Sequence, residues 1–337
     1  MEPNPTKLFA PRNRTLRLTT DDERTLAARL VQLPTSLSFD SLANKTLLGD
    51  SIAASKGLPA AVFDLIVADP PYNLAKDFRG TSFRKLSRRD YVAWLDSWIS
   101  QMRRLLTKTG TIYVCGEWQS SGAIQEVCEK YFIVRNRITW EREKGRGAMR
   151  NWKNCSEDIW FCTVSDDYYF DVDAVKVTRR VIAPYRDPDG SPRDWTVTEN
   201  GNFRITHPSN LWTDITIPFW SMPENTDHPT QKPEKLIAKL ILASSRAGDM
   251  IFDPFLGSGT TSVVAKKLRR HYLGIEVDEH YCCLAEKRIA LAEEDRRIQG
   301  YADEVFWERN TFSVQGNAPN DSTSDAAAQP TLFDAES

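Results

Sequence analysis

The sequence predicts an α/β fold in which helices cover both faces of a mostly parallel, twisted sheet. Residues 62–68 form an almost wholly apolar run, as expected of a parallel strand that is buried on both faces. Residues 250–278 carry the pattern strand, glycine loop, helix, strand. Between these two segments, strand-like runs alternate with amphipathic helices. The 337 residues suffice for one large domain with an inserted or appended subdomain.

The elements are predicted in the following order. Residues 1–20 are rich in Pro, Asn and Thr and are expected to form an extended arm, followed by a helix from Asp21 to Leu33. The sheet is expected to begin near Thr46. Then follow a strand at 62–68, a helix at Tyr91–Leu106 stopped by Gly110, a strand at Thr111–Cys115, a helix at Ser121–Lys130, and strands at Phe132–Thr139 and Glu157–Val164.

From Asp166 to Pro223 the periodicity fades, and a loop-rich stretch of that length in a compact enzyme is usually functional. Regular elements then resume with a helix at Pro233–Ser245, a strand from Met250, a helix at Thr261–Leu268, a strand at Tyr272–Asp278 and a helix at His280–Ile298. After about Asn310 the chain is predicted to be disordered. These changes divide the chain into segments 1–40, 41–165, 166–225, 226–307 and 308–337.

The tetrapeptide Asp69-Pro70-Pro71-Tyr72 directly follows the apolar strand at 62–68. Ligands in open α/β sheets bind at the carboxyl ends of strands, so these residues stand where chemistry is expected. The two prolines stiffen the local backbone and leave carbonyl acceptors. Asp69 adds a carboxylate acceptor, and Tyr72 adds a flat stacking face. The combination suits a planar exocyclic amine as the reacting group.

A second motif, residues 250–261, reads as a strand, a glycine loop and the start of a helix. The next strand ends at Glu276, whose carboxylate is placed to accept from both hydroxyls of a ribose. The loop lacks the third glycine of the dinucleotide fingerprint and the Lys-Ser/Thr pair of a phosphate-binding loop. A ligand with a ribose but no phosphates fits better, and S-adenosylmethionine is such a ligand.

Together these motifs resemble those of the β-class DNA amino-methyltransferases, which use S-adenosylmethionine. In that family D-P-P-Y comes first, followed by a target-recognition region, a segment like His228–Pro233, and the loop D-P-F-x-G-S-G-T-T. This chain carries all four in that order, and the resemblance covers roughly Thr46 to Ala290. It implies a circularly permuted Rossmann-like methyltransferase fold, with a catalytic half at 41–165, target recognition at 166–225 and a cofactor-binding half at 226–307.

The resemblance also implies a role for individual residues. The catalytic residues would be Asp69, Pro70 and Tyr72. The S-adenosylmethionine site would be formed by Asp50, Thr230, Lys232, Asp253, Phe255, Gly257, Gly259, Thr260 and Glu276. Within that set Asp50 would lie near the adenine, whereas Thr230 and Lys232, with Gln231, would close over the methionine end. A structural alternative exists for two of them: Asp50 caps a turn, or Thr230 starts the following helix.

The implied reaction is direct methyl transfer to an amine. Hydrogen bonds from the amine to the Asp69 carboxylate and the Pro70 carbonyl would favour a pyramidal nitrogen whose lone pair points at the sulfonium methyl. Asp69 would act mainly as an acceptor, and whether it also takes the proton is left open. The base must be flipped out of the duplex to reach the site, and Tyr72 would stack on it.

Within the family, Asp as the first residue of the motif is typical of adenine-N6 enzymes, and Ser is typical of cytosine-N4 enzymes. We therefore predict an adenine-specific DNA methyltransferase, with cytosine-N4 methylation as the alternative. Methyltransferases of protein or RNA amides usually carry N-P-P-Y downstream of the cofactor loop, which argues against that class. A non-catalytic DNA-binding relative would be expected to show decay in one of the motifs, and both are intact.

Double-stranded DNA is the predicted partner, although the formal net charge of −2 does not by itself indicate a DNA-binding protein. Basic side chains concentrate between Arg135 and Lys153, with Trp140, Met149 and Trp152 interleaved. The predicted DNA-contacting residues are Arg84, Lys85, Arg88, Arg142, Lys144, Arg146 and Arg150. The alternative for the 135–153 stretch is a solvated charged loop.

The pattern of the cysteines argues against a metal site and against a cysteine nucleophile. The six cysteines show no C-x-x-C spacing and no partnering histidine cluster, so we expect free thiols and no metal. No cysteine follows a proline, which excludes the Pro-Cys nucleophile of cytosine-carbon methyltransferases. No signal region or membrane span is apparent, so we expect a soluble cytoplasmic enzyme acting on the bacterial nucleoid.

Two further partners are suggested by the sequence or by the family. Gln329–Phe333 resembles the Q-x-x-L-F peptide by which bacterial proteins dock onto the replication sliding clamp. The alternative is a disordered tail that happens to carry two apolar residues. Many β-class enzymes are homodimers, but no interface patch is identifiable in this sequence. The DNA site that is read, and whether a restriction enzyme is paired with this chain in a restriction-modification system, are left open.

Overall fold

The computed structural model describes residues 11–31, 39–74, 76–78, 81–142, 149–181, 185–198 and 201–309. Its centre is an eight-stranded sheet with the strand order β1-β13-β12-β2-β5-β7-β6-β11. These strands are β1 (Lys45–Leu48), β2 (Phe63–Ala68), β5 (Leu106–Gly116), β6 (Ile133–Glu141), β7 (Ser156–Thr163), β11 (Leu211–Trp212), β12 (Met250–Asp253) and β13 (His271–Glu276). Only β7 runs against its neighbours, so the predicted mostly parallel sheet is confirmed.

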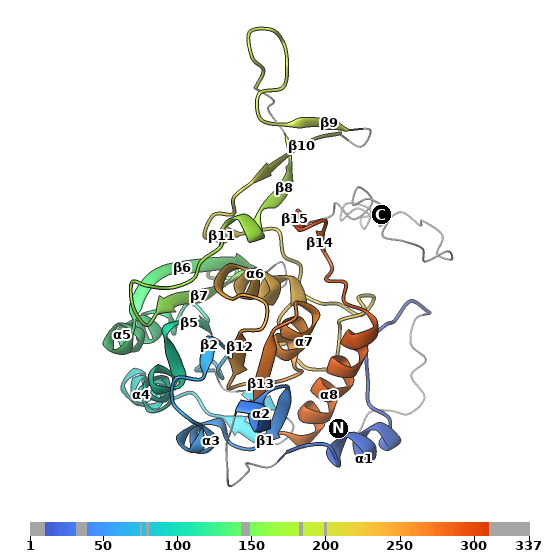
Figure 1. Ribbon diagram of the computed structural model, residues 1–337. Coiled ribbons are helices and arrows are strands. Elements are labelled where there is room, and N and C mark those ends of the chain that lie inside the picture. The colour runs from blue at the N-terminus through green and yellow to red at the C-terminus, as the bar shows by residue number, and fades with distance from the viewer. Residues whose placement is uncertain are drawn as a thin grey trace.

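Helices cover both faces of this sheet (Figure 1). The helices are α1 (Thr20–Ala27), α2 (Phe39–Leu42), α3 (Ser51–Gly57), α4 (Arg88–Leu105), α5 (Ser121–Tyr131), α6 (Glu234–Ser244), α7 (Thr260–Lys267) and α8 (Glu279–Glu294). Apolar residues of α3, α4 and α5 pack on one face, whereas those of α6, α7 and α8 pack on the other. The predicted doubly covered α/β architecture is therefore confirmed.

Strand β2 shows why the sequence requires both layers. Successive side chains of a strand point to opposite faces. Ile66 and Ala68 lie in the core beneath α4, whereas Leu65 and Val67 lie in the core beneath α6 and α7. All four side chains are at most 1% exposed. A continuous apolar run is thus the pattern of a central strand with helices on both sides.

Several element boundaries differ from the predicted ones. Helix α4 ends at Leu105, and Gly110 lies inside β5, so the prediction that Gly110 stops the helix is wrong. Helix α1 ends at Ala27, and Val31 instead forms a parallel bridge with Leu47. Helix α8 ends at Glu294 rather than Ile298. Beyond the ends of α1 and α8 the apolar residues keep a helical spacing in the sequence. In the structure Val31 and Ile298 instead form isolated β-bridges.

The region 166–225, which we predicted to be loop-rich, contains most of a second sheet. Its order is β14-β15-β8-β10-β9, with β8 (Val177–Arg180), β9 (Thr196–Thr198), β10 (Gly201–Thr206), β14 (Tyr301–Ala302) and β15 (Val305–Trp307). Strands β8 and β10 lead away from the body of the molecule as an arm that carries β9 (Figure 1). β15, which follows α8 in the chain, pairs with β8 and so adds a strand to the sheet of the inserted region. A 3₁₀ turn, η1 (Asp173–Val175), and a hairpin of β3 (Lys76–Phe78) and β4 (Thr81–Phe83) complete the described elements.

A buried ionic cluster fastens α6 to the inserted region. The Asp214 carboxylate is 2.9 Å from Lys235 Nζ and 2.8 Å from Lys239 Nζ. Lys235 Nζ also donates to the backbone carbonyls of Asp214 and Trp307. Burial alone would raise the pKa of Asp214, but the two ammonium groups lower it to about 2. We call Asp214, Lys235 and Lys239 the anchor cluster, because it joins α6, the inserted region and β15.

Candidate active site

A cavity of about 340 Å³ lies where β2, β12 and β13 end. It brings together residues about 180 positions apart in the sequence, as the two motifs predicted. The following predicted catalytic and cofactor residues line it: Asp50, Asp69, Pro70, Tyr72, Thr230, Lys232, Asp253, Phe255, Gly257, Thr260 and Glu276. Gly259 lies in the same loop, between the lining residues Ser258 and Thr260. The carboxyl ends of adjacent parallel strands meet at one edge of a sheet, which explains this convergence.

The hydroxyl of Tyr72 is held by charged groups on both sides. It lies 3.1 Å from Asp69 Oδ1 and 3.0 Å from Glu157 Oε2, and it accepts from Lys232 Nζ at 3.1 Å. Burial raises the pKa of Tyr72 well above its usual value, and the two carboxylates raise it further. Tyr72 is therefore a neutral hydroxyl whose ring is fixed at its outer end.

Lys232 points to the carboxylate of Asp69, the first predicted catalytic residue. Its Nζ is 2.6 Å from Asp69 Oδ2 and 3.3 Å from Glu157 Oε2, and its side chain is only 8% exposed. Burial alone would lower the pKa of Lys232, but Asp69 and Glu157 outweigh burial and raise it. The lysine therefore stays a cation between two carboxylates.

Glu157 is a site residue that the sequence reasoning missed. Its side chain comes from the start of β7, is 5% exposed, and lies 2.5 Å from Arg142 Nη1. Asp69, Glu157, Lys232 and Arg142, with the Tyr72 hydroxyl, thus form one charge-balanced group, which we call the catalytic cluster. The available signal was the pair of carboxylates, Glu157 and Asp158, that opens an otherwise apolar strand. Nothing in the sequence says that this strand faces a motif 85 residues away.

The glycine loop needs its glycines for two reasons. Gly257 and Gly259 have φ values of +53° and +84°, where side chains other than glycine are strained. A Cβ on Gly259 would also lie 2.6 Å from the Cβ of Ala285 on α8. The ring of Phe255 packs edge-on against Trp98, with 5.1 Å between the ring centroids. Both positions therefore require glycine for the backbone conformation, and Gly259 requires it also for the close packing of the loop on α8.

Acidic residues border the loop. Glu276 accepts backbone N–H bonds from Gly257, Val277 and Asp278 at 2.8–2.9 Å, and burial raises its pKa. A carboxylate has about four acceptor positions and three are taken, so about one remains, enough for one ligand hydroxyl rather than the two that we predicted. Burial raises the pKa of Asp253 to about 7, although its bonds with Thr261 and the Phe255 N–H oppose this. The carboxylate of Glu276 is thus fixed by backbone amides, and that of Asp253 is largely excluded from water.

The alternatives for Asp50 and Thr230 have different outcomes. Asp50 does cap α3, because its Oδ1 accepts from the N–H of Ala53 at 2.8 Å, and it lines the cavity at the same time. Thr230 does not start the next helix, since α6 begins at Glu234 with Pro233 as its cap. Gln231 braces its own loop: its side chain bonds Thr226 and the carbonyl of Glu224.

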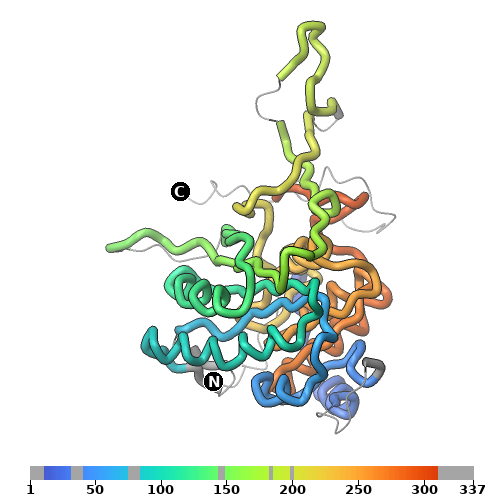
Figure 2. Tube along the Cα trace, turned by 60° about the vertical axis from the view of Figure 1, so that its left-hand side comes forward, coloured from blue at the N-terminus to red at the C-terminus, as the bar shows by residue number. Residues whose placement is uncertain are grey.

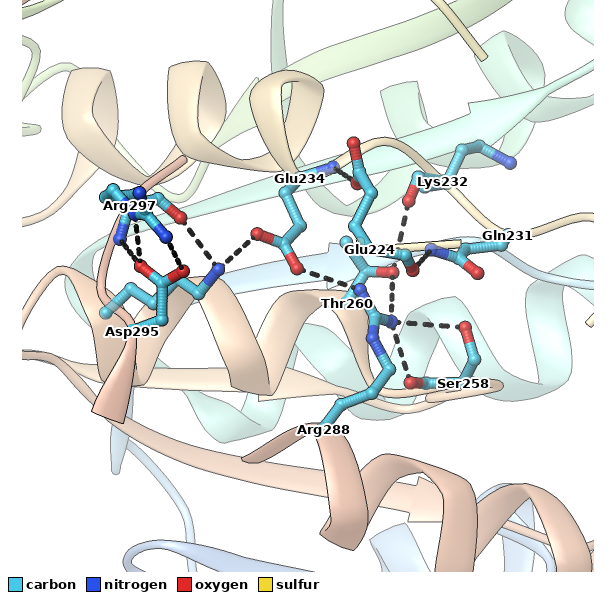
Figure 3. A network of polar contacts seen from close by, with 10 residues as sticks. Glu224, Gln231, Lys232, Glu234, Ser258, Thr260, Arg288, Asp295 and Arg297 are labelled. Atoms are coloured by element: carbon cyan, nitrogen blue, oxygen red, sulfur yellow. Dashed lines mark hydrogen bonds and ion pairs between the residues drawn. The ribbon is translucent and has the colours of Figure 1, made fainter. Parts of the chain in front are cut away.

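A buried network behind the cavity joins the glycine loop to the segment that carries Lys232 (Figure 3). Arg288 of α8 donates to the carbonyl of Ser258 at 2.8 Å, to Thr260 Oγ1 at 3.0 Å and to Glu234 at 3.0 Å. Thr260 Oγ1 in turn donates to the backbone carbonyl of Lys232 at 3.1 Å. The hydroxyl of Thr260 therefore serves to hold these two segments together.

The predicted DNA-contacting residues fall into three groups. Arg84, Lys85 and Arg150 are exposed on the surface. Arg88 pairs with Glu126 at 2.9 Å, and Arg142 belongs to the catalytic cluster. The positions of Lys144, Arg146 and the clamp-like peptide Gln329–Phe333 lie outside the described residues.

Residues 149–155, the described part of the connection that leads into β7, project from the body of the molecule (Figure 2). Its described part carries two strongly exposed apolar side chains, Met149 at 100% and Trp152 at 94%. The basic residues Arg150 and Lys153 lie beside them in the sequence. Residues 149–153 of the predicted aromatic and basic stretch are therefore open to solvent, whereas Trp140 lies in β6 and is buried, so that part of the prediction is wrong.

Other kinds of site are not found in the part of the chain that the structure describes. That part holds no group of three or more His, Cys, Asp or Glu suited to a metal ion. The six cysteines are free thiols, five of them buried. None of the described helices combines the length and the apolar character needed to cross a membrane.

Comparison with known proteins gives one family. The family model described as DNA methylase (N6_N4_Mtase) matches residues 63–287. The DNA adenine methyltransferase YhdJ of Escherichia coli K12 is 33% identical over 262 residues, which cover 75% of this chain and 85% of that protein. The type II methyltransferase M.HpaI of Haemophilus parainfluenzae is 32% identical over 250 residues, covering 73% of this chain and 74% of that protein.

Two solved structures share the fold. The PvuII DNA methyltransferase (cytosine-N4-specific) superposes with a TM-score of 0.54 at 17% identity, covering 72% of this chain and 85% of that one. The complex of M1.HpyAVI with SAM superposes with a TM-score of 0.50 at 22% identity, covering 72% of this chain and 98% of that one. At these identities the likeness concerns the fold.

Proposed function

The chain belongs to the DNA methylase family, and on this premise we propose that it methylates the exocyclic N6 of adenine in double-stranded DNA. DNA is its substrate, and S-adenosylmethionine is its methyl donor. The observation that carries the adenine assignment is the carboxylate of Asp69 at the head of the catalytic motif, in the wall of the cavity. The relative YhdJ, named a DNA adenine methyltransferase, supports the same choice.

The residues of the cavity fit S-adenosylmethionine. Gly257 lets the loop backbone line the cavity, Glu276 offers a carboxylate beside it, and no lysine of a phosphate-binding loop is present in the motif. Phe255 adds an apolar surface. When bound, S-adenosylmethionine supplies an electrophilic sulfonium methyl. We assign its ribose to Glu276 and its adenine to the side of the cavity near Asp50.

The chain's own residues then orient the amine. Asp69 and the Pro70 carbonyl accept its two N–H bonds, which favours a pyramidal nitrogen with an available lone pair. Tyr72 stacks on a base that has left the duplex, a contact worth about 1–3 kcal/mol. Holding the reacting groups in line is a proximity effect, on the order of 7–11 kcal/mol at its upper end.

The test is to identify the product. The protein is incubated with unmethylated DNA and S-adenosylmethionine, the DNA is digested, and the nucleosides are quantified by mass spectrometry, with Asp69→Ala as the matched control. We expect N6-methyladenine from the wild type, none from Asp69→Ala, and nearly equal binding of S-adenosylmethionine by both. N4-methylcytosine would overturn the choice of base, and loss of cofactor binding in Asp69→Ala would overturn the role of that residue.

The sliding clamp and a second copy of the chain are two further proposed partners. We propose that Gln329–Phe333 docks onto the sliding clamp, and a pull-down with purified clamp and a Leu332→Ala, Phe333→Ala variant tests this. Homodimer formation is tested by sedimentation. Neither is needed for the reaction above.

A further inference from the structure

We infer that Lys232 and Glu157 are positioning residues for the methyl transfer: they hold the Asp69 carboxylate and the Tyr72 ring in the geometry that receives the amine. This inference rests on the proposed function, because it concerns the same site. It differs from the role that the family resemblance implied for Lys232, which was to close over the cofactor.

The first support is where the ammonium of Lys232 lies. It contacts three oxygen atoms of the catalytic cluster, one each on Asp69 (2.6 Å), Tyr72 (3.1 Å) and Glu157 (3.3 Å). An ammonium has three N–H bonds, and three oxygen partners lie within reach of them. The side chain therefore directs its donors at Asp69, which accepts from the amine, at Tyr72, which stacks on the base, and at Glu157.

The second support is the hydroxyl of Tyr72. It carries a single hydrogen, yet two carboxylate oxygens lie at 3.0 and 3.1 Å from it, one on Glu157 and one on Asp69. Lys232 donates to the same oxygen. Glu157 and Lys232 thus fix the outer end of the ring, which would otherwise turn with its loop.

The third support is the origin of Glu157. It stands on β7, which is paired on one side with β5 and on the other with β6. A side chain on an internal strand is placed more exactly than one on a loop. The catalytic motif itself is a loop that follows β2. Glu157 is therefore held in place by the sheet. Its contact with Tyr72, and its contact with Lys232, which in turn bonds Asp69, hold these residues in place.

The arrangement leaves room for the amine. Lys232 bonds one oxygen of Asp69 and Tyr72 approaches the other, so about half of the roughly four acceptor positions of the carboxylate stay open. Asp69 is also the most accessible carboxylate of the cluster, at 24% exposed against 5% for Glu157. The group that must bind substrate is held in place without being saturated.

The backbone and side chain of Lys232 serve different partners, which makes the inference testable. Its carbonyl accepts from Thr260 of the glycine loop at 3.1 Å, whereas its ammonium contacts the catalytic cluster. A change of the side chain alone should therefore alter the rate of transfer and spare the cofactor.

The experiment compares Lys232→Met, Lys232→Arg and Glu157→Gln with the wild type. For each, kcat at saturating S-adenosylmethionine and DNA, the Kd for S-adenosylmethionine and the thermal unfolding midpoint are measured. We expect Lys232→Met to lower kcat about 100-fold, the cost of a misplaced reacting group, with the cofactor Kd within about twofold of wild type. Lys232→Arg should recover part of the rate, and Glu157→Gln should lower kcat about tenfold.

The double variant Lys232→Met, Glu157→Gln tests whether the two residues act as one unit. Its loss in kcat should be smaller than the product of the two single losses. A raised cofactor Kd with an unchanged kcat in Lys232→Met would overturn the inference in favour of a cofactor role. If Lys232→Met does not fold, Glu157→Gln decides, and a wild-type kcat in that variant overturns the inference.

Failure of the proposed function would look different. A wild type that forms N4-methylcytosine contradicts the adenine assignment, and the same variants then report on the cytosine reaction. The inference survives in that case if the rates fall while the cofactor Kd holds.

Discussion

Lys232 and Lys235 lie three residues apart in the chain, and both bury their ammonium groups against carboxylates, yet their pKa values move in opposite directions. Lys232 lies between Asp69 and Glu157, whose charges outweigh burial and raise its pKa. Lys235 shares the single carboxylate of Asp214 with Lys239, so burial prevails and lowers its pKa. The number of carboxylates per lysine therefore decides the direction of the shift.

The two clusters also differ in how much acceptor capacity they keep. In the anchor cluster Asp214 is 3% exposed, and both of its oxygens bond Lys239. In the catalytic cluster Asp69 is 24% exposed and stands in the wall of the cavity. A buried ion pair that serves folding can be fully satisfied, whereas one that serves chemistry must leave a position for the substrate. On the inference above, the comparison separates a structural lysine, Lys235, from a positioning lysine, Lys232.

The largest effect is expected from breaking the anchor cluster. Asp214→Ala leaves two buried ammonium groups without a counter-charge, and such a loss typically costs about 3–5 kcal/mol of stability. The free energy of unfolding, measured with urea, should fall by that amount, while the activity of the folded fraction remains close to wild type. A fall in activity without a fall in stability would mean that Asp214 serves the reaction instead.

The pH dependence of stability sharpens the contrast between the clusters. Burial lowers the pKa of Lys239 to about 8, below its ordinary value of 10.5, despite the attraction of Asp214. Between these two pH values the unfolded chain binds more protons than the native one, so stability should rise with pH, by on the order of 1 kcal/mol per unit. Lys239→Met should reduce this rise, and the lowered pKa of Lys235 should account for what remains. Urea unfolding at pH 8, 9 and 10 measures it, and equal slopes in both proteins would contradict the assignment.

A smaller effect is expected from the hydroxyl of Tyr72. Tyr72→Phe keeps the stacking ring and removes one oxygen that contacts Asp69, Glu157 and Lys232. A hydrogen bond to a charged group is worth about 1.5–3 kcal/mol, part of which the direct contact of Lys232 with Asp69 should preserve. We expect kcat to fall about tenfold in steady-state assays with an unchanged cofactor Kd. An unchanged kcat would show that the contacts of the Tyr72 hydroxyl are not needed to position its ring for the reaction.

Local sequence patterns predicted the sheet, its buried central strand and the two motifs that meet in the cavity, whereas the family resemblance supplied lining residues such as Asp50, Thr230 and Lys232. These features depend on short segments such as 62–72 and 250–261, where periodicity, prolines and glycines act within a few residues. The permuted order of the two halves stays a prediction from the order of the motifs.

Other features depend on contacts between distant segments, which local patterns do not encode. The pairing of β15 with β8 joins residues about 130 positions apart, and the bond from Tyr72 to Glu157 spans 85. The direction of the Lys232 side chain could not be predicted from the sequence either. A lysine beside a proline has the same sequence context whether its side chain faces the cofactor or a carboxylate. The ends of α1 and α8 were missed because apolar spacing continued beyond them.

The most direct test sets the two lysines against each other. The rate of N6-methyladenine formation in a single turnover and the Kd for S-adenosylmethionine are measured for Lys232→Met and Lys235→Met, each corrected for its folded fraction. We predict a rate about 100-fold lower for Lys232→Met with an intact cofactor Kd, and a near wild-type rate for Lys235→Met despite lower stability. Equal losses of rate in both variants, or a loss of cofactor binding in Lys232→Met alone, would contradict the account.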